Sequence, residues 1–438
     1  MRNSRRKSIA IAALACLVLP MFASYFFDDM FSSVSQLFKN PETLELGWDS
    51  QDLGNFIGDY SLLCICGGLI IGGILLDILG TRIMGSVFVA MMVIGGVMAY
   101  TGVAGWFPKE TAIAIGRAGR MLFGLGSEIA GVAVTRSIAK WFKDGNMSLA
   151  MGLQLAIARG GTALALIFAP AIVGMPKDFY TVADTARPAL IGCYLLFIGA
   201  AAWGAFTAID YFSDKSDGIK SGRGTVSDEN RFRFSDIPSL LKNPRFILIG
   251  LLCVCFYCCV SSFKKFGTSV VVPRFSLDAA QAGTMVAMIP FFTIVFTPLF
   301  GILVDKVGHA VRWMVLGSAA VLAGHLALAF APGEIQFFGY AGIALLGLGY
   351  SLVPSAMWPS VPKIVPEKNL GIAYSLIYWI QNLGLFLVPK AVGRIFATNP
   401  GLDGVAKAEY LFIILAVVAV TLAVLLGRLW TDNKNRKI

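Results

Sequence analysis

Glu128 and Arg159 are opposite charges placed within two successive apolar segments of this 438-residue chain. Glu128 lies 15 residues before Lys143, and Arg159 lies 15 residues after Asp144, in the polar turn between the segments. With a rise of about 1.5 Å per helical residue, both charges reach the same depth, near the middle of a bilayer. A carboxylate there suits an ammonium group and a guanidinium suits a carboxylate, so the pair fits a zwitterionic ligand. A structural ion pair between the two segments explains the spacing equally well.

Other apolar segments also carry charged residues, each of which costs roughly 2.5–3.5 kcal/mol on insertion scales and therefore needs a purpose. We expect Arg117 to be structural, while Asp28 and Asp29 face either water or a cavity. Carboxylates in a membrane can carry protons, and partnered structural acids are an equally good explanation. The charged residues in question are Asp28, Asp29, Asp59, Arg117, Arg120, Lys264, Lys265, Lys390 and Arg394.

Polar and aromatic residues gather in the second half of the chain. Gln381 and Asn382 lie in the middle of an apolar segment, where amides either line a cavity or join helices, and we expect one of each. Trp358 is either an interface anchor or the floor of a cavity. The same region contributes Tyr374, Tyr378 and Trp379.

Several classes of chemistry are not supported by the sequence. His309 and His325 are not placed like a catalytic dyad, and no nucleophile motif, nucleotide-binding loop or metal-ligand spacing is found. All eight cysteines fall in predicted spans, where free cysteine behaves as a small hydrophobe, including the run Cys253-Val-Cys255-Phe-Tyr-Cys258-Cys259. We expect neither an enzyme nor a cofactor.

The elements that must position these residues are membrane-spanning helices. Hydrophobic residues make up 57% of the chain and charged residues 14%, against about 25% charged residues in soluble domains. Apolar stretches of about 20 residues recur along the chain. The sequence predicts an all-α membrane protein with twelve spans, at 8–38, 52–80, 83–105, 110–138, 147–174, 185–211, 244–272, 278–304, 311–331, 335–363, 368–397 and 405–430.

Charge distribution predicts the topology of these spans. Lysine and arginine concentrate in the termini, the central loop and alternate short loops, which the positive-inside rule assigns to the cytoplasm. The net charge of +10 is therefore explained by topology, and we expect no nucleic-acid partner. The predicted division is an N-terminal six-helix bundle at 1–212, a cytoplasmic linker at 213–243 and a C-terminal six-helix bundle at 244–438.

One motif occurs in both halves. Gly73-Ile-Leu-Leu-Asp77-Ile-Leu-Gly80-Thr-Arg82 returns as Gly301-Ile-Leu-Val-Asp305-Lys-Val-Gly308-His-Ala-Val-Arg312. A parallel repeat in an apolar chain predicts two similar helical bundles with a site between them, as in transporters. The repeat resembles motif A of the major facilitator superfamily, and Arg120-Met-Leu-Phe-Gly124-Leu-Gly126 resembles its motif B. The expected gating residues are Gly73, Asp77, Gly80, Arg82, Arg120, Asp305 and Arg312.

A narrower resemblance covers nearly all predicted spans. Gly119 to Glu128, Lys140-Trp-Phe-Lys143, Gly152 to Arg159 and Gly347-Leu-Gly-Tyr350-Ser-Leu are similar to the lysosomal dipeptide uniporter family, as are Trp358-Pro359 and Ile380-Gln-Asn-Leu-Gly384. The resemblance implies that Glu128 binds the amino end of a dipeptide and Arg159 its carboxyl end. The full candidate substrate-binding set is Glu128, Arg159, Asp29, Lys265, Tyr350, Trp358, Tyr374, Gln381 and Asn382.

The sequence also departs from that family. It has no acidic dileucine sorting motif, and its only glycosylation sequon, Asn146-Met-Ser148, falls on the predicted cytoplasmic side. We therefore expect a monomer in a bacterial inner membrane that moves dipeptides by alternating access, either as a uniporter or with protons carried by Asp29, Asp59 or Glu128. A facilitator for another zwitterionic or carboxylate-bearing metabolite is the alternative, and a membrane sensor that binds without transporting is a third hypothesis.

Overall fold

The computed structural model describes most of the chain as long helices. In the part of the chain that it describes there is no strand, and twelve helical segments are long and apolar enough to cross a membrane. The predicted all-α architecture with twelve spans is confirmed. The described residues are 2–35, 37–39, 46–142, 147–174, 180–216, 237–366 and 369–435.

Spans of the first half come from α1 to α6. Span 2 is not one regular helix, because a 3-10 turn (Asp59–Ser61) and a π-helical turn (Cys64–Gly68) separate α2 from α3. Spans 2 and 3 run through α3 without a loop, joined at Gly80. The bounds are α1 (Arg2–Ser33), α2 (Ser50–Gly58), α3 (Leu69–Val103), α4 (Lys109–Trp141), α5 (Met147–Val173) and α6 (Val182–Ser216).

Spans of the second half come from α8 to α13, preceded by the short α7 (Ile237–Leu241). A 3-10 segment (Trp358–Lys363) extends the fourth of them. The bounds are α8 (Pro244–Phe275), α9 (Ala279–Val307), α10 (Ala310–Phe330), α11 (Gln336–Met357), α12 (Leu370–Thr398) and α13 (Leu402–Asn435).

The repeated motif has a backbone reason for its glycines. Gly80 and Gly308, which are equivalent in the two copies, have φ angles of +82° and +71°. These angles lie in the region that only glycine enters at little cost. The motif therefore turns the chain sharply between two spans in each half.

Contacts divide the chain into two units, one formed by Met1–Trp48 and Asp59–Val226 and the other by Asp49–Gly58 and Ser227–Ile438. The α2 helix thus belongs with the second unit, where it packs against α12. A Cβ atom on Gly54 would lie 2.7 Å from the Cα atom of Gly393, so only glycines allow this approach. The predicted bundle boundaries remain a prediction, and the linker at 213–243 lies largely outside the described residues.

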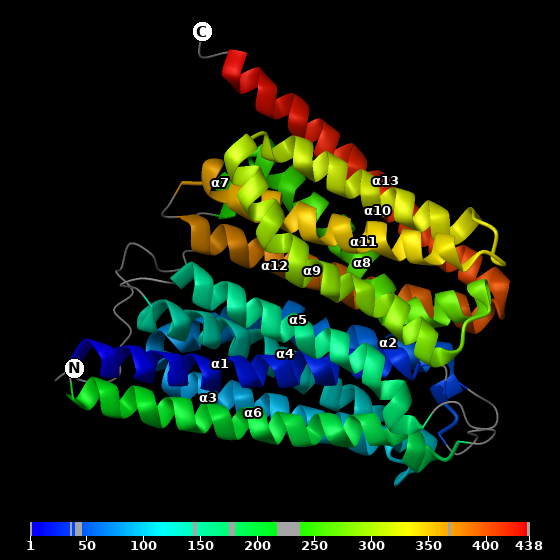
Figure 1. Cartoon of the computed structure of the whole chain (residues 1–438), viewed down its shortest axis with the longest axis horizontal. Helices are drawn as coiled ribbons and strands as arrows, with labels where there is room; N and C mark the ends of the chain where they lie inside the picture. The colour runs from blue at the N-terminus through cyan, green and yellow to red at the C-terminus, as the bar shows by residue number, and fades with distance from the viewer. Residues whose placement is uncertain are drawn as a thin grey trace. The chain divides into compact units, whose positions relative to one another are not determined.

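Within the first unit, α1 packs against α5 and α6, and α3 packs against α4 (Figure 1). The α3–α4 contact is made by glycine: a Cβ atom on Gly102 would lie 2.5 Å from the Cα atom of Gly116. One on Gly119 would lie 2.4 Å from the Ala99 nitrogen, and one on Gly126 would lie 2.5 Å from the Met92 nitrogen. Small residues let two helix backbones meet directly, which is how helices associate in a membrane.

The second unit contains a buried polar pair between α10 and α13. His325 Nδ1 and Glu409 Oε2 are 2.9 Å apart, and both side chains are fully buried. The rings of Phe263 and Phe412 each lie 5.3 Å from the imidazole, centroid to centroid. Among the described residues, neither His325 Nε2 nor Glu409 Oε1 has a hydrogen-bond partner. The pair therefore depends on its one mutual hydrogen bond.

We predict that Glu409→Leu lowers the free energy of unfolding by about 1–3 kcal/mol, because it leaves a buried imidazole with no hydrogen-bond partner. The double substitution His325→Leu/Glu409→Leu should recover most of this loss, since a packed apolar pair needs no compensation. Thermal unfolding of the purified proteins measures both effects. Asp403→Ala, at an exposed ion pair on the same helix, is the matched control and should cost under about 1 kcal/mol. A double variant as unstable as the single one would contradict this account.

Candidate functional site

Glu128 lies on α4 in the first unit and is only partly exposed. Its Oε1 atom accepts a hydrogen bond from the Tyr60 hydroxyl at 3.1 Å. The same hydroxyl lies 3.3 Å from Ser127 Oγ, which is 2.5 Å from Ser24 Oγ on α1. Among the described residues Glu128 forms no ion pair, and its only hydrogen-bond partner is a neutral phenol.

Arg159 lies on α5 of the same unit and is also partly exposed. Its guanidinium carbon lies 5.8 Å from the centre of the Tyr25 ring on α1, at cation–π distance. An aromatic face attracts a guanidinium through its ring electrons, and the forked donors of a guanidinium match the geometry of a carboxylate. The two predicted poles are therefore both in the first unit, one held by a phenol and the other beside an aromatic ring.

Four more of the charged candidates in the first unit, and Asp59, contact other side chains of the protein. Arg117 Nε donates to Asp59 Oδ2 at 2.5 Å, in agreement with a structural role for Arg117. Arg120 Nη2 donates to Asp28 Oδ1 at 2.6 Å. Asp29 is buried and accepts a hydrogen bond from Thr162 Oγ1 at 2.7 Å, and this hydrogen bond joins α1 to α5.

Candidate residues of the second unit form an aromatic cluster. Trp358 donates from Nε1 to the Tyr257 hydroxyl at 3.1 Å and stacks on Tyr378 with ring centroids 5.0 Å apart. The Tyr374 hydroxyl donates to the Trp358 carbonyl oxygen at 3.3 Å. Tyr350 completes the cluster with its ring 5.7 Å from that of Tyr257. Trp358 thus packs against three aromatic side chains, remains partly exposed, and has its indole nitrogen satisfied within the protein.

Three other candidates of the second unit lie on α8 and α12. Gln381 is buried and its Oε1 atom lies 3.3 Å from Cys253 Sγ, so it connects α12 with α8. Asn382 donates to the Tyr378 carbonyl oxygen of its own helix at 3.1 Å. Lys265 is partly exposed on α8. Whether any of these contacts a ligand remains a prediction.

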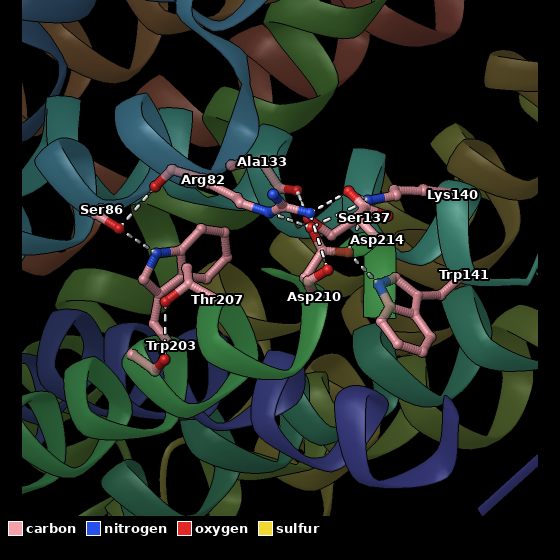
Figure 2. A network of polar contacts seen from close by, with 11 residues as sticks. Arg82, Ser86, Ala133, Ser137, Lys140, Trp141, Trp203, Thr207, Asp210 and Asp214 are labelled. Carbon is pink, nitrogen blue, oxygen red and sulfur yellow. Dashed lines mark hydrogen bonds and ion pairs between the residues drawn. The ribbon is translucent and has the colours of Figure 1, made fainter. Parts of the chain in front are cut away.

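The first copy of the repeated motif is the centre of a polar network (Figure 2). Arg82 donates from Nε to Asp210 Oδ2 at 2.5 Å and from Nη2 to Asp214 Oδ2. Lys140 contacts both carboxylates, at 2.8 and 2.9 Å. Trp141 Nε1 donates to Asp210 at 2.7 Å. Two cations and two anions thereby join α3, α4 and α6.

The second copy is arranged differently. Asp305 and Arg312 are both exposed, and a Cβ atom added to Gly301 would meet no described atom within 4 Å. In the first copy Gly73 is similarly open, and the side chain of Asp77 lies outside the described residues. The repeat therefore preserves the backbone turn in both halves, whereas the charge network is built on the first copy.

Several functional candidates were not anticipated from the sequence. Tyr60 was missed because a single tyrosine in an apolar span gives no signal of its own. Tyr257 was hidden for the same reason within the cysteine-rich segment. Asp210 and Asp214 do carry a signal, since two acids four residues apart on one helix face require nearby cations. Among the described residues, no group of three or more His, Cys, Asp or Glu side chains could hold a metal ion.

Comparison with known proteins defines the class. The family model of the Major Facilitator Superfamily matches residues 17–389 and 258–437, so the chain belongs to that superfamily and is an integral membrane protein. The nucleoside transporter NupG (D323A mutant) has the same fold, with a TM-score of 0.69 over 94% of this chain and 98% of its own, at 13% sequence identity.

Within the superfamily, the chain is similar to lysosomal dipeptide transporters. It is 30% identical to MFSD1 of Mus musculus over 374 residues, which cover 83% of this chain and 76% of the relative. MFSD1 of Homo sapiens is likewise 30% identical over 375 residues, with the same coverage. The resemblance to the dipeptide transporter family is confirmed, and the relatives are transporters.

We predict that Asp210→Ala destabilises the protein by about 1–3 kcal/mol, because it removes a buried carboxylate that accepts hydrogen bonds from Arg82, Lys140 and Trp141. Asp214→Ala should cost less, since Asp214 accepts from two side chains and Asp210 from three. Thermal unfolding measures the order. Asp305→Ala, in the exposed second copy, is the matched control and should cost under about 1 kcal/mol. If Asp210→Ala and Asp305→Ala lowered the stability equally, the network would not contribute to the stability of this unit.

Proposed function

We propose that this superfamily transporter moves dipeptides, with Glu128 binding the peptide ammonium and Arg159 binding its carboxylate. The observation that carries the proposal is the environment of Glu128. A carboxylate at mid-membrane costs several kcal/mol unless a positive charge compensates it. Among the described residues none does so, because Tyr60 supplies a hydrogen bond and no charge. A ligand ammonium supplies the missing charge.

The geometry of Arg159 supports the same ligand. Its guanidinium lies beside the Tyr25 ring on the same unit as Glu128. A guanidinium binds a carboxylate through two parallel hydrogen bonds, which gives directional recognition. The similarity to dipeptide transporters, over 83% of the chain, agrees with a substrate that carries both an amine and a carboxylate.

The proposal includes the mode of transport and the location. We infer alternating access, the mode that a repeated six-span architecture supports. The lysine and arginine distribution favours cytoplasmic termini, and the location that we propose is a bacterial inner membrane. Dipeptide uptake into proteoliposomes, measured at equal and at unequal pH across the membrane, separates uniport from proton coupling. Accumulation of the dipeptide that follows the pH gradient indicates coupling.

We predict that Glu128→Gln and Arg159→Lys each reduce transport at low dipeptide concentration at least about tenfold, as expected for loss of one charge-assisted or bidentate contact. Counterflow of labelled dipeptide into proteoliposomes preloaded with unlabelled dipeptide is the measurement. Glu110→Gln on α4 and Arg187→Lys on α6 are matched controls, because both residues are exposed and lie at helix starts.

Blocked peptides separate dipeptides from other substrates. An N-acetylated dipeptide lacks the ammonium, and a dipeptide amide lacks the carboxylate, so neither should compete with the labelled dipeptide in the wild-type protein. Competition by the N-acetylated peptide would assign the protein to carboxylate-bearing metabolites instead. Normal counterflow by the Glu128→Gln protein would show that Glu128 does not bind the peptide ammonium.

A further inference from the structure

Span 2 loses its regular helix where it passes Glu128. The chain leaves α2 at Gly58, makes the 3-10 turn Asp59–Ser61, and then the π-helical turn Cys64–Gly68, in which Gly67 has a φ of +99°. Such interruptions are uncommon in helices, and those that occur often lie at functional sites. This one places Tyr60 directly against α4.

Two contacts hold the turn in place. On one side, the buried carboxylate of Asp59 is paired with Arg117 Nε at 2.5 Å. On the other, the Tyr60 carbonyl oxygen lies where a side chain at position 124 would be, since a Cβ atom on Gly124 would lie 1.9 Å from it. Two contacts with α4 thus fix the backbone of Tyr60: the ion pair of Asp59 with Arg117, and the close approach of the Tyr60 carbonyl to Gly124.

The Tyr60 side chain then reaches the carboxylate. Its hydroxyl donates to Glu128 Oε1, and no described residue donates a hydrogen bond to Oε2, which is the oxygen that we assign to a ligand. Its ring packs against Phe123 with centroids 6.0 Å apart, and the Arg120 guanidinium carbon lies 5.4 Å from the ring centre. The hydrogen bond of Arg120 goes to Asp28. The nearby cation is therefore committed to another acid, and Glu128 receives a neutral donor.

We propose that Tyr60 is the positioning residue of the amine site: it orients the Glu128 carboxylate through one oxygen and places no positive charge beside it. This inference rests on the proposed function of Glu128. A cationic donor in the same place would compete with the ligand ammonium, whereas a phenol leaves the negative charge available. Asp59, Arg117 and Gly124 act through Tyr60 by holding its backbone.

The first test compares dipeptide counterflow kinetics for wild type, Tyr60→Phe, Glu128→Gln and the double variant. Tyr60→Phe keeps the ring and the turn, so it should raise KM about tenfold, the effect of one hydrogen bond to a charged group. The maximal rate should stay within about twofold of wild type. In the Glu128→Gln background, measured at high peptide concentration, Tyr60→Phe should add less than about twofold.

The matched control for Tyr60→Phe is Tyr100→Phe on α3, whose ring packs on Trp106. It should leave KM unchanged. If Glu128→Gln impairs transport while Tyr60→Phe does not raise KM, or if the two losses are simply additive, the positioning role is wrong and the proposed function stands. If Glu128→Gln transports normally, the amine role itself is wrong.

A second test reaches Tyr60 through its backbone. Gly124→Ala places a methyl group against the Tyr60 carbonyl, so it should raise KM as Tyr60→Phe does and add little to that variant. Gly204→Ala on α6 is its control, because a Cβ atom there meets nothing within 4 Å. Thermal unfolding identifies a Gly124→Ala protein that fails to fold, in which case Tyr60→Phe alone decides. A folded Gly124→Ala protein with wild-type KM would overturn the role of the turn.

Discussion

The cost of an uncompensated charge in hydrocarbon is the constraint on which this structure depends. In the first unit that cost is met inside the protein at Asp59 with Arg117 and at Asp28 with Arg120. Each pair also joins two helical segments, so the charges contribute to the packing. Glu128 differs from these acids, because its partner among the described residues is uncharged. That difference distinguishes a residue that holds the fold from one that is available to a ligand.

The fold was predictable because its signal is repeated along the whole chain. Twelve apolar stretches and a duplicated glycine motif predict spanning helices in two related halves, and neither depends on an exact residue. The depth argument for Glu128 and Arg159 used only helical rise. It could not decide between an ion pair and a ligand site, because spacing gives depth and not the direction in which a side chain points.

What the sequence could not predict lies where helices are irregular or contacts are distant. Tyr60 reaches Glu128 only because the helix is interrupted at Asp59, and nothing in the local sequence specifies a 3-10 turn there. The assignment of α2 to the second unit depends on contacts with α12, which is distant in sequence: Gly54 packs on Gly393, and Gln51 donates to the Lys390 carbonyl oxygen, 339 residues away. The two copies of the motif look alike in sequence, yet the acids that complete the first one, Asp210 and Asp214, lie on another span.

The glycine contacts between α3 and α4 have a mechanical consequence. Two helices whose backbones touch at several levels cannot slide past each other or separate without opening voids that no side chain fills. They therefore move as a single rigid lever. Glu128 is on this lever, and Lys140 is 12 residues further along the same helix, about 18 Å away. A displacement of α4 at Glu128 is consequently transmitted along the helix to Lys140 and, through the packed α3, to Arg82.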